Sequence, residues 1–243
     1  MTLVYPRDDF QAYLTAVLET WLHRAPEWTI AAESDDWFPA SGPQRSVRAD
    51  GQAARRIAEG VKAHAGARAW LVLSLAFRHA DRGKEAVLAE FVRLCVRHGE
   101  STLDHLDPEV CETLRRARAV RAEAHRFVGL VRFRAVDGGW YARFEPDHDV
   151  LGLLVEPFQK RMEGYDWMLH DEGRQAAWVC RAGVGEGVRG VRVSAGPGRD
   201  PDADVQDLWR LYFRTTAVPE RINLGLQRSK MPHKTWKNLV EKG

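Results

Sequence analysis

Residues 127–146 read FVGLVRFRAVDGGWYARFEP, and the fold class is decided here because the hydrophobic pattern changes its period within this stretch. Before Phe127 the apolar residues recur at helical spacing. Within 127–146 they alternate on both sides of a turn that contains Asp137, Gly138 and Gly139. Alternation around such a turn is typical of a β-hairpin. A helical half followed by strands predicts an α+β protein.

The chain before this stretch is predicted to be helical. Asp8 and Asp9 can cap a first helix whose apolar residues lie on one face. Residues 34–50 contain turn formers without periodicity, which indicates a loop. Further helices are expected near residues 51–64, 67–80, 84–98 and 108–125.

The chain after this stretch alternates between the two periods. Residues 147–162 return to helical spacing, and residues 165–171 and 175–181 read as strands on either side of a turn. A glycine-rich segment with one short strand, 188–193, and a helical tail follow. We therefore expect an α-helical region, 1–125, and a second region, 126–243, that holds a small antiparallel sheet with a packed helix and the tail. The two regions are expected to form one compact unit.

Composition excludes several classes of protein. With 243 residues, 44 % of them hydrophobic, the chain can bury a large core. Cys95, Cys111 and Cys180 form no CxxC pair, which argues against a disulfide framework or a zinc knuckle. No stretch reaches the roughly 18 apolar residues of a membrane span, and no signal-peptide pattern is present. These features predict a cytoplasmic protein without a membrane partner.

The small net charge of +2 conceals two strongly basic segments. Residues 115–134 contain seven arginines and one acid, and residues 205–243 contain eight basic and three acidic residues. Aromatic residues are interleaved with the basic ones in the second segment. Basic groups neutralise phosphates and flat rings stack on bases, so the pattern points to nucleic acid.

The tail offers the more specific candidates for this contact. Arg210 and Arg214 are four residues apart on an expected helix, beside an aromatic stripe that includes Tyr212, and together they could bind one phosphate. Side chains near helix termini and in loops reach ligands more easily. The tail residues placed there are Arg221, Asn223, Lys230, Lys234 and Trp236. Ordinary packing with a solvated basic face is one alternative, and an acidic protein partner is another.

Recognised catalytic motifs are absent: the sequence has no GxSxG, P-loop, HExxH or Rossmann fingerprint. Glu123 and His125 could act as an acid/base pair if the chain is extended there, because both side chains would then share one face. On a helix they would diverge by about 200°. Ordinary surface ion pairs with the nearby arginines are the alternative.

A second polar cluster precedes the helix expected within 147–162. Two carboxylates around an imidazole, Asp147, His148 and Asp149, could bind a metal or activate water. The alternative is that Asp147 or Asp149 caps this helix, because an acid at this place is also what an N-cap requires. Asp171 lies at the end of a strand and is a further candidate for catalysis. The alternative for this residue is a role in the turn that follows the strand. We predict no metal site and no cofactor.

Four segments of the chain, taken in order, resemble an uncharacterised bacterial family associated with DNA metabolism and repair. The segments are DDFQAYLTAVLETW, EAHRFVGLVRFR, FEPDHDVLGLLVEPFQKR with YDWMLHDEGRQAAWV, and WRLYFRTTAVPERINLGLQRSKMPHKTWKNLVE. Members of that family occur beside a radical-SAM protein linked to DNA repair, or are fused to a uracil-DNA glycosylase-like domain. The resemblance therefore implies DNA, single-stranded or damaged duplex, as a partner. It also implies a separate radical-SAM or glycosylase-type enzyme as a second partner.

The resemblance also highlights individual positions. In the first half of the matching region these are His125, Arg126, Gly129, Arg132 and Phe133. Further on they are Pro146, Asp147, Phe158, Arg161, Trp167, Asp171, Tyr212, Arg221, Asn223, Pro232 and Trp236. The sequence departs from the pattern around Asn223, where Ile222 and Leu224 replace a basic residue and a proline. This departure weakens the case for each tail position as a ligand contact.

Three functional hypotheses follow. The first is an accessory DNA-repair protein that binds DNA through the arginine block of residues 115–134, including Arg126 and Arg132, through Arg161 and through the tail. The second is a DNA glycosylase or lesion hydrolase that acts on an extruded nucleotide with Glu123, His125, Asp147 or Asp171. The third is a protein-interaction module without nucleic-acid contact.

Overall fold

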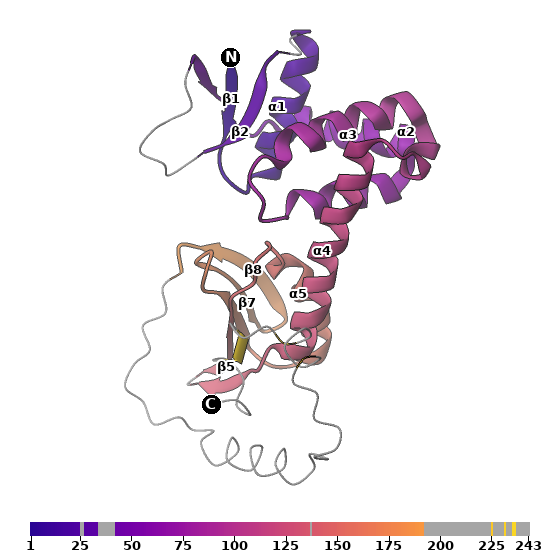
Figure 1. Ribbon diagram of the computed structural model, residues 1–243. Coiled ribbons are helices and arrows are strands. Elements are labelled where there is room, and N and C mark those ends of the chain that lie inside the picture. The colour runs from indigo at the N-terminus through magenta and orange to yellow at the C-terminus, as the bar shows by residue number, and fades with distance from the viewer. Residues whose placement is uncertain are drawn as a thin grey trace. The chain divides into compact units, whose positions relative to one another are not determined.

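The computed structural model describes residues 1–24, 27–33, 42–136 and 138–191, together with residues 225, 231, 235 and 236 (Figure 1). It divides into two compact units, Met1–Arg121 (unit 1) and Ala122–Gly243 (unit 2). Helices and two small sheets confirm the predicted α+β class. Within the described residues, no helix has both the length and the apolar content needed to cross a bilayer.

Unit 1 begins with a small parallel sheet that the sequence analysis did not predict. Strands β1 (Thr2–Tyr5), β2 (Thr29–Ala32) and β3 (Gln44–Ser46) lie in the order β2-β1-β3, and both pairings are parallel. The α-helical region expected over residues 1–125 therefore also contains a sheet, and the loop expected over residues 34–50 includes β3. Each strand has only three or four residues, so alternation is too short to stand out from its surroundings.

The helices of unit 1 lie where the hydrophobic period placed them. Helix α1 (Phe10–Leu22) begins after Asp9, whose side chain accepts the N–H of Ala12 at 3.0 Å, as predicted. Helix α2 (Gly51–Phe77) is interrupted at Gly66, where φ is +82°, so the two helices expected there are joined at a kink. Helix α3 (Lys84–His98), the 3₁₀ helix η1 (Gly99–Asp104) and helix α4 (Pro108–Leu130) follow.

The β-hairpin of unit 2 starts later than predicted. Helix α4 continues to Leu130, and Phe127 packs against Phe144 with ring centroids 5.2 Å apart. The hairpin consists of β4 (Arg134–Val136) and β5 (Gly139–Phe144). Val128, Gly129 and Leu130 suit either period, and the uninterrupted run of helix formers before them carries the helix onward.

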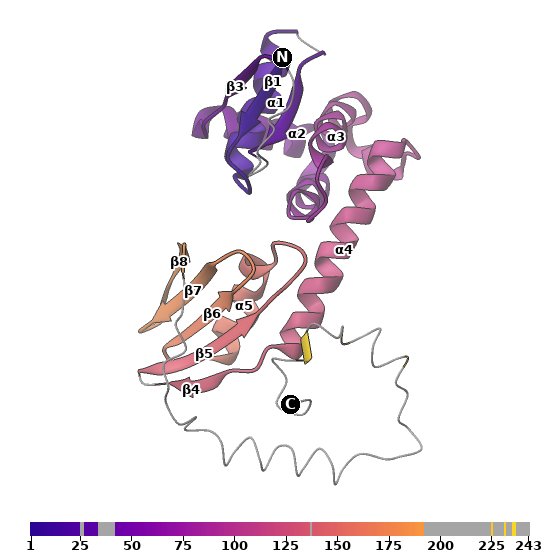
Figure 2. The same ribbon diagram turned by 60° about the vertical axis from the view of Figure 1, so that its left-hand side comes forward.

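An antiparallel sheet was expected in unit 2, but its five-stranded sheet is mixed (Figure 2). Its order is β4-β5-β6-β7-β8, with β6 at Trp167–Asp171, β7 at Ala176–Arg181 and β8 at Val184–Arg189. Strands β5 and β6 are parallel because α5 (Leu151–Arg161) connects them, and a parallel pair needs such a crossover. Strands β6 and β7 confirm the predictions, and the register pairs Trp167 with Cys180.

Strand β8 begins four residues before the predicted strand 188–193 and includes Gly185 and Gly187. Gly185 and Gly187 face the indole of Trp178 on β7. A Cβ at Gly185 would come within 2.5 Å of the Trp178 ring nitrogen, whereas one at Gly187 would sit 3.7 Å from the ring. Gly185 therefore leaves room for the tryptophan ring against the edge strand, where a Cβ would overlap it.

Candidate functional site: a clamped loop and the basic face of α4

Glu123 is the acid of α4 that the fold buries, with 1 % of its surface exposed. Its two carboxylate oxygens accept the backbone N–H groups of Asp147, at 3.0 Å, and His148, at 2.7 Å. Hydrogen bonds to an ionised group are the strong ones. Glu123 thus holds the backbone of the loop between β5 and α5.

Arg174 holds the same loop through its backbone carbonyl groups. Arg174 donates to the backbone oxygens of Pro146, at 3.2 Å, and Asp147, at 2.5 Å. Its guanidinium is oriented by Asp171, a fully buried carboxylate 3.2 Å away that also accepts the N–H of Arg174 at 3.1 Å. Burial raises the pKa of Asp171 above its ordinary value, although Arg174 opposes this effect.

These contacts show the positions of the acids that the sequence analysis selected, Asp147, Asp149 and Asp171. Helix α5 has Val150 as its N-cap, so the prediction that Asp147 or Asp149 caps it was wrong. The backbone of Asp147 is held by long-range partners, while its side chain is exposed. The turn role weighed for Asp171 is present in its bond to the Arg174 N–H.

Glu123 and His125 do not form a pair. Both lie on α4, where a separation of two residues turns the side chains about 200° apart. Glu123 is buried and His125 is exposed. The structure therefore realises the helical alternative, in which the two cannot cooperate.

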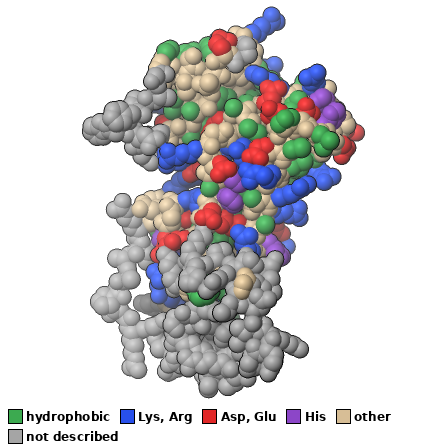
Figure 3. Space-filling model, in the orientation of Figure 1, with side chains coloured by type: hydrophobic (Ala, Val, Ile, Leu, Met, Phe, Trp, Pro, Cys, Tyr) green, Lys and Arg blue, Asp and Glu red, His purple; other side chains and the backbone are tan. Residues whose placement is uncertain are grey.

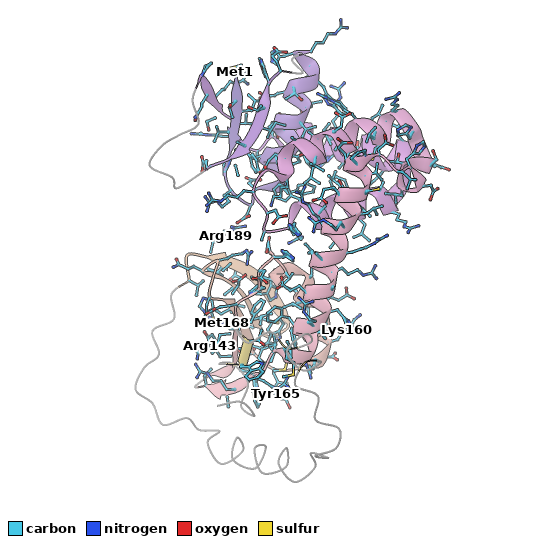
Figure 4. All side chains as sticks on the ribbon, viewed as in Figure 1. Met1, Arg143, Lys160, Tyr165, Met168 and Arg189 are labelled. Atoms are coloured by element: carbon cyan, nitrogen blue, oxygen red, sulfur yellow. The ribbon has the colours of Figure 1, made fainter. Side chains whose placement is uncertain are left out.

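The face of the sheet that carries Tyr141 contains a polar pair that sequence reasoning missed. The hydroxyl of Tyr141 on β5 lies 2.9 Å from Nδ1 of His170 on β6, and both residues are buried. Burial raises the pKa of Tyr141, and the guanidinium of Arg134 lies 5.1 Å from its ring centroid. Arg143 and Met168, labelled in Figure 4, mark these two strands. Only the strand register brings the pair together, so a single sequence carries no signal for it.

Several arginines of residues 115–134, and Arg161 on α5, have structural partners. Arg115 and Arg116 form ion pairs with Glu112 and Asp81. Arg132 donates to the carbonyl of Gly129 at 2.6 Å, and Arg161 donates to that of Val128 at 3.3 Å. Cations favour the carbonyl end of a helix, so these last two stabilise the end of α4.

The remaining basic residues of α4 share one face of the helix. Arg118, Arg121 and His125 are exposed and Arg126 is partly exposed, and the four lie within about 140° of the helix circumference. The acids of α4, Glu109, Glu112 and Glu123, fall outside this sector. Within the part of the chain that the structure describes, Arg118 and Arg121 form no ion pair. We call these four residues the basic face of α4; Figure 3 shows Lys and Arg side chains on the surface over this helix.

The tail half of the expected interface falls mostly outside the described residues. This applies to Arg210, Tyr212, Arg214, Arg221, Asn223, Lys230 and Lys234. Trp236 is described: it is partly buried, and its indole N–H donates to the carbonyl of Met231 at 2.9 Å.

Comparison with known families identifies the family of this chain. A family model described as a domain of unknown function, DUF4130, matches residues 82–241, which include α3, α4 and the whole sheet of unit 2. Searches among curated proteins and among solved structures found no match.

Proposed function

Because the chain belongs to the DUF4130 family, whose function is unknown, its role has to be inferred from its own residues, and we propose that it binds DNA as an accessory protein of DNA metabolism. The observation that carries this proposal is the basic face of α4, three arginines and a histidine without an acid among them. The resemblance to a family associated with DNA repair supports the same choice of partner. The chemistry would then belong to a separate enzyme of the radical-SAM or glycosylase type.

The geometry of the acids favours binding over catalysis by Glu123 or Asp171. Each is buried and already accepts hydrogen bonds from the backbone or from Arg174. An acid or base that works on a nucleotide has to reach it within hydrogen-bond distance. Neither carboxylate could do so without releasing the loop.

The proposal predicts a salt-dependent affinity that depends on the arginines of α4. If Arg118, Arg121 and Arg126 each neutralise one phosphate of a duplex, raising salt from 50 to 200 mM weakens binding by about 40-fold. The double substitution Arg118→Gln/Arg121→Gln should weaken binding and flatten the log–log salt slope by about 1.8. Fluorescence anisotropy with labelled single-stranded and duplex DNA measures both quantities.

A matched control separates this effect from net charge. Arg55 and Arg56 are adjacent exposed arginines on α2, so Arg55→Gln/Arg56→Gln removes the same charge from another helix. It should leave the slope unchanged. Equal effects of the two double variants, or binding insensitive to salt, would refute the proposal. Product formed from lesion-carrying oligonucleotides, and lost in Asp147→Asn, would instead favour a hydrolase that uses the clamped loop.

A further inference from the structure

Three side chains of unit 1 that the sequence analysis did not single out have the spacing of metal ligands. One ligand atom from each of His98, His105 and Asp107 lies within 4.8 Å of the other two. Oδ2 of Asp107 is 3.5 Å from Nε2 of His98 and 3.8 Å from Nδ1 of His105. All three residues are partly buried, and all lie within the region that the family model matches.

The local chain holds these residues in place through its own turns. His98 ends α3, and Gly99 follows with φ at +63°, a conformation that reverses the chain into η1. Thr102 within η1 is fully buried and donates to the carbonyl of Gly99 at 2.6 Å. His105 then stacks on His98 with ring centroids 3.9 Å apart. Asp107 directly precedes Pro108, the first residue of α4.

Ser101 contacts the outer ring nitrogen of His105. Its hydroxyl donates to the carbonyl of His98 at 2.9 Å, and the same oxygen lies 3.3 Å from Nε2 of His105. While its single hydrogen is on that carbonyl, the oxygen can only accept from the ring, which favours the neutral tautomer with the proton on Nε2. The lone pair of Nδ1 is then left on the side of Asp107. A partner that fixes the second ring nitrogen in this way is the usual arrangement around a metal-bound histidine.

His98 contributes a second nitrogen suited to a cation. Its Nε2 is buried and has no hydrogen-bond partner among the residues that the structure describes, although a carboxylate oxygen lies 3.5 Å away. Buried polar atoms normally find a partner, so each exception requires an explanation. Ligands about 2.1 Å from a tetrahedral zinc ion are about 3.4 Å apart, close to the separation of His98 and Asp107.

We propose that His98, His105 and Asp107 bind a divalent transition-metal ion of the zinc type. Two imidazoles and one carboxylate match the ligand preferences of Zn²⁺. Binding requires His105 to tilt out of its stack, so that its Nδ1 converges with the other two atoms. Three protein ligands leave a fourth position for water, and the side chains of His105 and Asp107 are exposed enough, at 40 % and 34 %, for an ion to enter.

Metal titration of the full chain, after chelator treatment, tests this site. Zn²⁺ should bind with one-to-one stoichiometry in calorimetry, and Co²⁺ should give the intense visible absorption of a four-coordinate site. His98→Gln and Asp107→Asn should each weaken Zn²⁺ binding more than tenfold. Ser101→Ala, which frees the second nitrogen of His105, should weaken it by about 10- to 100-fold.

The matched control is His64→Gln, which removes an exposed histidine of the same unit and should leave binding unchanged. Circular dichroism checks that each variant remains folded. The Co²⁺ spectrum of the unaltered protein keeps the test decisive even if a variant does not fold. Absence of saturable binding, a six-coordinate Co²⁺ spectrum, or equal loss in His64→Gln would overturn the proposal.

Discussion

Glu123 is buried, yet both of its carboxylate oxygens are satisfied by the backbone N–H groups of Asp147 and His148. An amide at this position would keep one acceptor and turn an NH₂ group toward the other N–H. Removing one partner of a buried hydrogen bond leaves the other unsatisfied, which is the costly case. Glu123 therefore stabilises the loop between β5 and α5.

Glu123→Gln should lower the free energy of unfolding by about 2 kcal/mol, because one charge-assisted bond is lost and one N–H is left facing a donor. Urea denaturation measures this change. Glu163→Gln, at an exposed position just after α5, is the control and should stay within about 0.5 kcal/mol of the unaltered protein. A similarly small effect for Glu123→Gln would contradict the clamp.

Asp171 makes stability depend on pH. Burial raises its pKa in the folded protein above the ordinary 3.8, so the folded state holds the proton more tightly than the unfolded state. Its contribution to stability is therefore fully present below pH 3.8 and is lost as the pH rises through the folded pKa. Relative to Asp171→Asn, the unaltered protein should lose stability across that window.

Denaturant unfolding of both proteins at a series of pH values measures this difference. Asp171→Asn also alters the contact with Arg174, which shifts its stability by an amount that does not depend on the titration of residue 171. The slope of the difference with pH is thus the relevant quantity. A flat or rising difference would show that Arg174 outweighs burial.

At the scale of elements, β8 is unusual because a glycine-rich segment forms a strand. The strand pairs with β7 along its whole length, and the indole of Trp178 occupies the space that a side chain at position 185 would take, whereas a Cβ at position 187 would only touch the ring. Glycine weakens a strand in general, but here it allows close approach of an aromatic ring. The two glycines differ in how near the ring lies.

Gly185→Ala should destabilise unit 2 by about 1–3 kcal/mol, because the new methyl group would overlap the indole of Trp178. Gly187→Ala is the matched control in the same strand, since its methyl would make an ordinary contact 3.7 Å from the ring. Thermal unfolding followed by tryptophan fluorescence compares the two. Equal effects would show that strand propensity, and not the contact, governs both positions.

At the scale of the whole molecule, charge placement matters more than total charge. The chain has a net charge of +2, yet α4 alone carries a face with three arginines and no acid among them. Arg115 and Arg116 form ion pairs within the fold, and Arg132 and Arg161 donate hydrogen bonds to carbonyl groups at the end of α4. The salt slope predicted for DNA binding should therefore reflect the few arginines left on that face, not the seven counted in the block.

The sequence by itself determined the α+β class, α1 with its Asp9 cap, and strands β6 and β7, because each depends on local periodicity or on one capping side chain. Tertiary structure decided the mixed sheet and the burial of Glu123, because the first depends on the crossover through α5 and the second on partners 24 and 25 residues away. It also decided which arginines remain exposed. The stacking of His98 on His105 could not be predicted from the sequence either. It depends on the path of the chain through η1, which local composition does not determine.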